Sequence, residues 1–452
     1  MTLRSLIHKR VVAFAYVLLI TTGACESGAG KVVYAGGTLW NGTGVPPIFD
    51  AIVIVSDGHI EAAGPPDVVA IPRGADVRRV DGRWLIPGLI DAHAHVERWM
   101  MAPFLAHGIT AVRGAGGEQD SVVALRDDAL LGSMLAPRLY ISGAAINAAP
   151  ATPPDVGLST PTEARRARDE LVLVDATHAV ISPKMTSALL RPLMDEANSL
   201  IVPVAGNLGR IDAITAAGAG VMALEHLSGI VEASVTNPSA YFRAHTNFYA
   251  GQKMVLQGWT MLDSARLDRT ARALADARVV IIPTLHYHET FSRLRDQSYI
   301  NSLDLSPVPE SIRNAWNIAR LVREARLTGR NFTTFRRARP RQDLFVRRFR
   351  TAGGVIAAGS NAPETLMAPG AGLHAELAQL ARAGLSPRDV LLAATRDAAV
   401  LLAADSIGTI EAGSVADFVV LRGDPLEDIA NTIEIEFVVF KGVRYYPEDF
   451  ER

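Results

Sequence analysis

The stretch LIPGLIDAHAHVE, residues 85–97, places His93 and His95 one residue apart at the end of an apolar run. Because successive side chains of a strand point to opposite faces, the two imidazoles share one face. Neutral imidazole is a common zinc ligand, and two from one strand leave room for other ligands and a water molecule. An isolated H-x-H pair is more often an incidental surface feature, so the surrounding elements must decide its role.

Eight short apolar runs alternate with helix-like segments through the middle of the chain. They read WLIPGLIDAHAH, ITAVR, RLYISG, HAVIS, LIVPVAG, GVMALEH, VVIIPTL and GVIAAGS. This rhythm predicts an α/β fold, a closed parallel (β/α)8 TIM-like barrel, whose reactive residues lie at the C-terminal ends of the strands. The two histidines stand at such an end.

Both ends of the chain show short alternating patterns separated by Gly, Asp and Pro, which predict antiparallel strands. They include VVYAGGTLW and AIVIVSDGHIEAAG near the start, and GTIEAGSVADFVVLRGD and IEIEFVVFKGVRYY near the end. We expect residues 31–85 and 405–447 to form one small composite β-sandwich domain. Residues 86–404 then form the barrel.

The bulk composition restricts the partners. The chain has 452 residues, 49% of them hydrophobic, which permits a large buried core. Its formal net charge of -2 gives no reason to expect a nucleic acid partner. Eleven arginines lie between Arg320 and Arg350. A solvated helix is the ordinary interpretation of this run, and a docking face for an acidic partner or a membrane surface is the alternative.

Residues 1–24 are built like an export signal, with a basic start, the apolar core VVAFAYVLLI and a small-residue segment before Cys25. The apolar run is too short to span a bilayer. The only cysteine of the chain stands where a bacterial lipoprotein is lipidated, although Thr22 departs from the aliphatic residue preferred there. We expect an exported protein, periplasmic or anchored to the outer membrane by a lipid on Cys25. The alternative is a buried or incidental thiol on an N-terminal helix.

Several motifs resemble one family in the expected order. PGLIDAHAHVE resembles the first-strand signature of the amidohydrolase superfamily, and more narrowly of the imidazolonepropionase-like branch of metal-dependent hydrolases. GITAVRGAG resembles the second strand, VAGNLGRIDAITAAGAGVMALEHLSGI the fifth and sixth, and IAAGSNAPE the eighth. GTIEAGSVADFVVLRGDPLEDI resembles the segment that completes the accessory sheet. The resemblance covers nearly everything after the leader.

In that family, metal is held by two first-strand histidines, a carboxylated lysine on the fourth strand, histidines on the fifth and sixth, and an aspartate on the eighth. The aspartate also accepts a proton from the metal-bound water, which attacks an amide-like carbon. His93 and His95 match the first-strand pair, and His226 matches the sixth-strand histidine. The resemblance therefore implies one or two zinc ions if the site is functional, and none otherwise.

Three positions depart from the family pattern. Asn207 stands where the fifth-strand histidine is expected, and its carbonyl is a weaker zinc ligand than imidazole. Asn361 stands at the aspartate position and has no basic site near neutral pH, which costs ~10²- to 10⁴-fold in rate. The bridging lysine position falls on Val180 or Ile181. Lys184 lies nearby in a different register, and either substitutes for that lysine or begins the next helix.

Other polar residues lie close to strand ends. His286 and His288 follow the seventh strand, and we expect this second alternating pair to face one way. Glu289 and Glu364 are either polar loop residues or members of a rebuilt site, because strand-end loops of barrels tolerate replacement. Glu225 is expected to point away from the sixth-strand histidine, toward the helices or a loop.

Three functions are compatible with these residues. The first is a metal-dependent hydrolase of carbon-nitrogen bonds other than peptide bonds, acting on a small cyclic amide or aminoacyl compound. The alternative is a catalytically impaired homologue that binds a ligand or partners another envelope protein. A weaker third is a barrel enzyme that uses His and Glu as acid and base without metal. The sequence does not identify the substrate or the oligomeric state.

Overall fold

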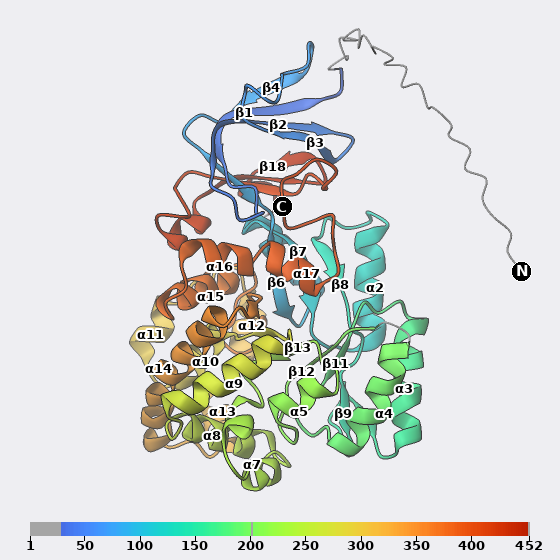
Figure 1. Cartoon of the computed structure of the whole chain (residues 1–452), viewed down its shortest axis with the longest axis vertical. Helices are drawn as coiled ribbons and strands as arrows, with labels where there is room; N and C mark the ends of the chain where they lie inside the picture. Colours follow the sequence, from blue (N-terminus) through green and yellow to red (C-terminus); the bar gives the residue numbers. More distant parts are fainter. Residues whose placement is uncertain (1–28, 200–201, 451–452) are drawn as a thin grey trace, which may run out of the picture.

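The computed structural model describes residues 29–199 and 202–450. The leader, residues 1–24, and Cys25 lie outside this part of the chain. Figure 1 shows a sheet of strands at one end and a larger body of strands and helices below it. Within the described ranges, no helix is both long and apolar enough to cross a membrane.

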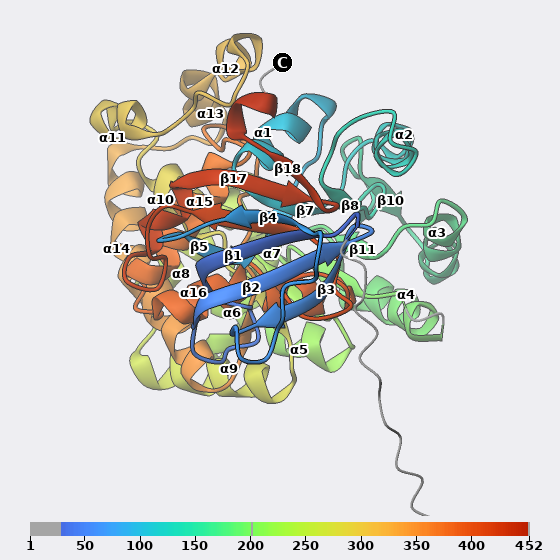
Figure 2. The same ribbon diagram turned by 90° about the horizontal axis from the view of Figure 1, so that it is seen from above.

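The accessory sheet combines the two ends of the chain. Its order is β18-β17-β16-β5-β1-β2-β3, and β4 pairs with β1. The strands are β1 Val32–Leu39, β2 Ile48–Ser56, β3 His59–Gly64, β4 Asp76–Arg79, β5 Trp84–Pro87, β16 Phe418–Leu421, β17 Ile435–Phe440 and β18 Val443–Tyr445. The antiparallel pairing of β16 with β5 joins the two ends, and Figure 2 shows the blue and red strands side by side. The predicted composite sheet is confirmed.

Local sequence explains this sheet. Asp57 and Gly58 connect β2 to β3 with φ of +48° and +75°, the backbone that a two-residue hairpin turn of this twist requires. On one face, alternating residues bury an apolar cluster that includes Tyr34, Leu85 and Phe418. The rings of Tyr34 and Phe418 meet edge to face at 5.1 Å between centroids. The cluster thus ties the first strand to the last part of the chain.

The barrel contains a parallel strand in each of the eight predicted runs. These strands are β6 Leu89–Ala94, β7 Ile109–Gly114, β8 Arg138–Tyr140, β11 Ala179–Ile181, β12 Val204–Gly206, β13 Ala223–Glu225, β14 Val280–Ile282 and β15 Val355–Ile356. Backbone hydrogen bonds from Ala92 to Ala358 (2.8 Å) and from Thr177 to Ile141 (2.9 Å) join the three-stranded and seven-stranded sheets. The prediction of a TIM-like barrel is confirmed.

Two further strands were not predicted. They are β9 Ile146–Ala148 and β10 Val156–Leu158, which extend the larger sheet beside β11. Their sequences, INA and VGL, contain no apolar run that would announce a strand. They pair in parallel and so add to the wall of the barrel rather than to the accessory sheet.

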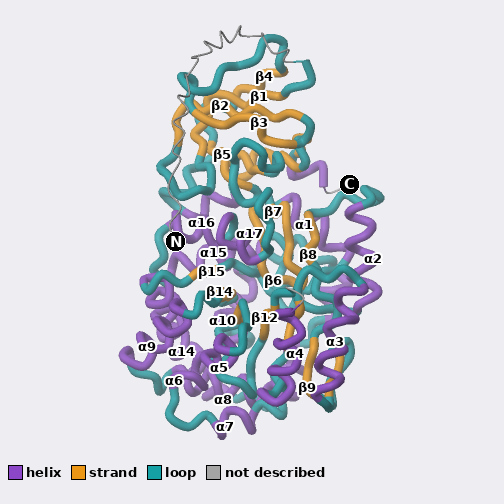
Figure 3. Tube along the Cα trace, turned by 45° about the vertical axis from the view of Figure 1, so that its right-hand side comes forward, coloured by secondary structure: helices purple, strands orange, loops and turns teal. Residues whose placement is uncertain are grey.

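Helices surround the barrel strands, purple around orange in Figure 3. They are α1 Met101–Ala106, α2 Gln119–Leu130, α3 Pro161–Leu173, α4 Ser187–Ser199, α5 Ala213–Gly218, α6 Ile230–Ser234, α7 Ser239–Ala244, α8 Phe248–Trp259, α9 Ser264–Asp276, α10 Leu285–Ser292, α11 Gln297–Ser302, α12 Glu310–Ala315, α13 Ile318–Glu324, α14 Gly329–Thr351, α15 Ala371–Arg382, α16 Pro387–Ala393 and α17 Arg396–Leu401. Short 3-10 turns are η1 Arg98–Met100, η2 Ile429–Ile433 and η3 Pro447–Phe450. Capping residues define several of these starts, as where Thr160 and Glu163 cap each other at α3.

Much of the basic run lies on α14, and part of it is internal. Arg350 pairs with Asp389 at 2.7 Å and with Asp397 at 3.3 Å. Arg339 is buried and pairs with Glu289 at 3.1 Å. These arginines attach α14 to neighbouring helices, so the interpretation of the run as a purely solvated face does not hold for them.

Candidate functional site

A cavity of about 840 Å³ opens at the C-terminal ends of the barrel strands. The cavity is lined by all six residues that the resemblance marks as site candidates: His93, His95, Lys184, Asn207, His226 and Asn361. They come from or just after β6, β11, β12, β13 and β15, which are distant in the chain. The closed parallel barrel brings these strand ends to one edge, where such folds carry their sites.

His93 is at the centre of the contacts. Its side chain is buried, and its ring centroid lies 4.5 Å from that of His226 and 5.3 Å from that of His95. Its Nε2 lies 3.1 Å from Oδ1 of Asn361. Its Nδ1 is buried, makes no hydrogen bond of good geometry among the described residues, and lies against the carboxylate of Glu225.

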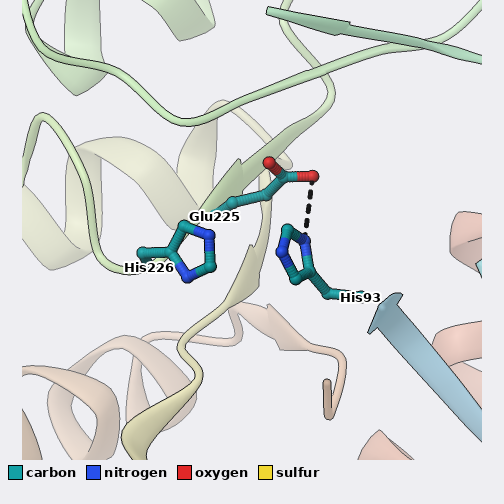
Figure 4. A group of neighbouring side chains, drawn as sticks. All are labelled: His93, Glu225 and His226. Atoms are coloured by element: carbon teal, nitrogen blue, oxygen red, sulfur yellow. Dashed lines mark ion pairs between the residues drawn. The ribbon is translucent and has the colours of Figure 1, made fainter. Parts of the chain in front are cut away.

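The predicted direction of the Glu225 side chain is wrong. It was expected to point away from His226, but its carboxylate is buried and its Oε1 lies 3.3 Å from Nδ1 of His93. Figure 4 shows the Glu225 carboxylate and the His93 ring directed toward each other. The strand ends at Glu225, and His226 and Leu227 adopt left-handed φ values of +57° and +54°. The alternation of a strand stops there, so both side chains enter the same cavity.

His93, Glu225 and His226 form what we call the His-Glu cluster. One donor atom from each residue lies within 4.8 Å of the others. Two imidazoles and a carboxylate are a donor set that holds catalytic zinc in other hydrolases. The hydrogen bond of 2.8 Å between Nδ1 of His226 and Oγ1 of Thr284 leaves Nε2 as the nitrogen that can bind metal. The residues present therefore fit one metal ion.

The charges around Glu225 keep the cluster in a form that suits a metal. Burial alone would raise the pKa of Glu225, but the nearby charges of His93 and Arg113 hold it well below its usual range. Nη1 of Arg113 donates to Oε1 at 2.9 Å. Burial, followed by the charge of His93, lowers the pKa of His226 well below its usual value. An ionised Glu225 and a neutral His226 are the states in which these two groups bind metal, whereas the His93 charge belongs to a protonated ring, which must lose its proton before it binds metal.

A family comparison decides the identity of the fold. The sequence model named Amidohydrolase family matches residues 84–444. The chain belongs to the amidohydrolase family. This confirms the resemblance at the level of the superfamily, whereas the imidazolonepropionase-like branch stays a prediction.

Solved structures agree on the fold. A candidate prolidase from Bifidobacterium longum has a TM-score of 0.70 at 23% identity, over 93% of this chain and 97% of that one. Bottromycin amidohydrolase has a TM-score of 0.69 at 22% identity, over 93% of this chain and 88% of that one. Adenine deaminase from Paracoccus denitrificans (strain Pd 1222) is 36% identical over 91 residues. That match spans 18% of this chain and only 15% of the deaminase.

The two asparagines occupy the mouth of this amidohydrolase barrel. Asn361 is buried with a φ of +60°, and its backbone N–H donates to the carbonyl of His93 at 2.9 Å. Its side chain faces His93 rather than solvent. Asn207 follows β12, and its backbone N–H donates to the carbonyl of Ile181 at 3.0 Å. Both amides reach the cavity that the family's histidine and aspartate would share, and neither carries a charge.

The fourth barrel strand carries no lysine. Val180 and Ile181 lie on β11, are buried and line the cavity. Lys184 follows that strand, and its Nζ donates to the carbonyl of Pro150 at 3.0 Å. Its backbone N–H donates to Oδ1 of Asn147 at 3.0 Å. Lys184 thus lies on the cavity wall with its amine already engaged.

The prediction that His286 and His288 face one way is wrong. Both lie on helix α10, which begins at Leu285, so a spacing of two residues turns their side chains to different sides. His288 lines the cavity, and its Nε2 lies 2.9 Å from the carbonyl oxygen of His226. Burial lowers the pKa of His288 to about 3 and that of His286 to about 4. His288 therefore supports the His226 backbone as a neutral ring.

Glu289 and Glu364 lie in different surroundings. Glu289 is buried on α10 against arginines and does not line the cavity. Glu364 lines the cavity with an exposed side chain.

Sequence reasoning also missed the roles of Arg113 and Thr284. An arginine inside the apolar run ITAVRG, fully buried on β7, was the available signal for the first. The hydroxyl of Thr284 gave no comparable signal.

Proposed function

We propose that this chain is a hydrolase that cleaves a carbon-nitrogen bond other than a peptide bond in a small molecule. In this proposal His93, Glu225 and His226 hold a single zinc ion beside the substrate. The observation that carries it is the His-Glu cluster, whose donor atoms lie within 4.8 Å of one another on the wall of the 840 Å³ cavity. The family supplies the reaction class, and the cluster differs from the family set by including Glu225.

The chain's own residues prepare the cluster. A bound zinc ion would polarise a carbonyl oxygen and acidify a water molecule. Arg113 holds the Glu225 carboxylate ionised and in place through the 2.9 Å hydrogen bond. Thr284 fixes the ring of His226, and His288 holds the backbone carbonyl of the same residue. These contacts fix the orientation of the donors before a ligand enters.

Proton transfer is the weak point of this site. Oδ1 of Asn361, 3.1 Å from His93, can accept a hydrogen bond but cannot take up a proton. All three residues of the His-Glu cluster are assigned to the zinc ion, and the low pKa of Glu225 makes its carboxylate a weak base in any case. We therefore expect slow turnover, reduced by ~10²- to 10⁴-fold compared with a site that has a positioned base.

A specific observation favours a second candidate, a binding protein without catalysis. Glu225 is paired with Arg113, and Asn361 is hydrogen-bonded to His93. This network is charge-balanced without a bound cation, and a neutral amide is better tolerated in a buried pocket than a second carboxylate. The same cavity would then hold a small molecule without cleaving it.

Metal analysis of the purified full-length protein separates the two candidates. The hydrolase predicts about one equivalent of zinc per chain, slow hydrolysis of N-acyl amino acids or cyclic amides, and loss of that turnover on chelation. Glu225→Gln should lose the zinc, whereas Glu411→Gln, an exposed carboxylate outside the cavity, should keep it. Folded protein that neither holds nor takes up zinc would rule out the hydrolase and leave the binding protein.

We also propose that the protein is exported and carries a lipid on Cys25, as the leader pattern indicates. Mass spectrometry of the mature protein tests this directly. A mature chain that begins at Cys25 with added lipid mass supports the proposal, and a chain that retains residues 1–24 contradicts it.

A further inference from the structure

The charged residues around the cavity do not balance. Among the described residues that line it, Asp155, Glu225 and Glu364 are acidic and Lys184 is the only lysine or arginine. Glu225 is neutralised by Arg113. Glu364 has no hydrogen-bond or ion-pair partner for its carboxylate anywhere in residues 29–199 and 202–450.

Asp155 and Lys184 occupy one part of the wall through a shared neighbour. Nδ2 of Asn147 donates to Asp155 at 3.1 Å, and Oδ1 of Asn147 accepts from the backbone N–H of Lys184 at 3.0 Å. The Lys184 ammonium itself donates to the carbonyl of Pro150 at 3.0 Å, so it balances Asp155 only in the count of charges. By that count one negative charge remains in the cavity, and among the described residues Glu364 is the lining carboxylate without a hydrogen-bond or ion-pair partner.

Aromatic rings extend along the cavity from the His-Glu cluster. Tyr287 lies 5.7 Å from His226 and 6.0 Å from Phe291, and Tyr249 lies 5.3 Å from Phe248, all between ring centroids. All of these residues line the cavity. The Glu364 carboxylate and the rings of Tyr249 and Tyr287 line the same cavity.

A third group in this region lacks a partner. Nε2 of Gln252 donates to the hydroxyl of Tyr287 at 2.6 Å, which orients the amide. Oε1 of Gln252 is then left as a buried acceptor with no donor among the described residues. A buried acceptor without a donor is costly unless a ligand or water satisfies it.

We propose that the ligand of this cavity carries a positively charged ammonium or guanidinium group, held by the Glu364 carboxylate and the rings of Tyr249 and Tyr287. A cation is attracted by both a carboxylate and the face of a ring. An anionic ligand would meet the uncompensated carboxylate instead. The inference rests on the proposed function and narrows its substrate to an amine-bearing amide or aminoacyl compound.

Three matched probes test the preference without any reaction. We would measure binding of 2-phenylethylamine, 2-phenylethanol and 3-phenylpropionate to the full-length protein by ligand-observed NMR at pH 7 and low salt. The expected order is amine, then alcohol, then carboxylate, with the amine about tenfold tighter than the alcohol. The preference should weaken as salt is added, because Glu364 is exposed.

Variants locate the preference. Glu364→Gln keeps the size of the side chain and removes its charge. It should therefore weaken binding of the amine about fivefold and leave binding of the alcohol unchanged. Tyr249→Leu should weaken binding of the amine more than binding of the alcohol, because it removes a ring face. Glu411→Gln is the control and should change neither, since it removes an exposed carboxylate that does not line the cavity.

Equal affinity for amine and alcohol in the wild type, absence of amine binding, or an amine preference that survives Glu364→Gln would overturn the inference. The probes contain no amide, so their binding is independent of turnover. Zinc-dependent hydrolysis without cation preference would leave the proposed function standing alone. Cation preference in a protein that takes up no zinc would support the inference and contradict the proposed function.

Discussion

Two buried carboxylates in this chain have opposite surroundings. Glu289, on α10, is contacted by Arg293 at 2.6 Å, Arg339 at 3.1 Å and Arg382 at 3.0 Å. Two of these arginines come from α14 and α15, so the carboxylate joins three helices. Its oxygens are occupied by guanidinium donors, and the small cavity of about 240 Å³ beside it is lined mostly by arginines.

Glu225 has a much thinner shell of cations. Among the described residues it pairs with one guanidinium, that of Arg113, and one imidazole, that of His93. Its remaining capacity faces the cavity that His226 also lines. The comparison indicates that burial alone does not distinguish a structural carboxylate from a reactive one. The number and type of its cationic partners do so.

The largest expected effect concerns the structural carboxylate. Arg339→Met should lower the free energy of unfolding by about 3–5 kcal/mol, because it leaves Glu289 and Asp343 with a missing buried partner. Urea denaturation measures this. Arg337→Met, on the same helix but exposed, should change the value by less than about 0.5 kcal/mol. Equal small losses in both variants would mean that the other two arginines suffice for Glu289.

A third carboxylate extends the comparison to a site without an ion-pair partner among the described residues. Glu376 on α15 is fully buried and accepts from the backbone N–H of His286 at 2.7 Å, and burial raises its pKa from 4.5 to about 8. The folded protein thus keeps this proton between pH 4.5 and 8, where the unfolded chain loses it. Stability should fall as pH rises through this window, by on the order of 3 kcal/mol.

Glu376→Gln should remove this dependence, because an amide does not titrate and its oxygen can still accept from His286. The measurement is the unfolding free energy at pH 5 and pH 8 for wild type and variant. Glu411→Gln, an exposed carboxylate, is the control for general charge effects. A variant as pH-dependent as the wild type would show that Glu376 is ionised in the fold.

The reactive carboxylate is tested through metal affinity. Glu225→Gln should weaken zinc binding by about 100-fold, because it replaces a charged ligand with a neutral amide. Glu289→Gln should lower stability and leave zinc affinity unchanged. Competition with a chromophoric chelator measures both variants on the same scale. If Glu289→Gln weakened zinc binding as strongly as Glu225→Gln does, the distinction between the two carboxylates would fail.

Restoring the family residues should act in the opposite direction and more weakly. Asn207→His combined with Asn361→Asp adds an imidazole and a carboxylate at the barrel mouth, and zinc affinity should rise about tenfold. Turnover should rise as well, because an aspartate at position 361 can accept a proton. Each single variant is the control for the double one. Unchanged affinity in the double variant would mean that these side chains do not reach the metal.

The barrel was predictable because its strands are apolar runs and its helices fill the gaps between them. The strands β9 and β10 were not, since INA and VGL lack such runs. The convergence of His93 and His226 follows from the order of strands in a parallel barrel. The orientation of Glu225 does not, because it depends on the left-handed backbone of the next residue, which a histidine in sequence does not announce.

A similar limit explains the error at His286 and His288. Strand alternation was extended past residue 282, but the chain enters helix α10 at Leu285. Apolar residues continue across that boundary, so periodicity alone could not place it. The buried partners of Glu289 were hidden for a related reason, since they come from helices that are distant in the sequence.

The smallest expected effect concerns Lys184. A lysine that bridges metals must present a free amine to the cluster, but Nζ of Lys184 donates to the carbonyl of Pro150 at 3.0 Å. Lys184→Met should therefore change zinc affinity by less than about twofold, with or without added bicarbonate, because the His-Glu cluster does not need it. The same chelator competition measures this, with Lys253→Met, on helix α8, as the control for a lost lysine charge. A bicarbonate-dependent loss of zinc in the Lys184 variant alone would show that the amine leaves Pro150 and joins the site, and the cluster would then need a fourth protein ligand.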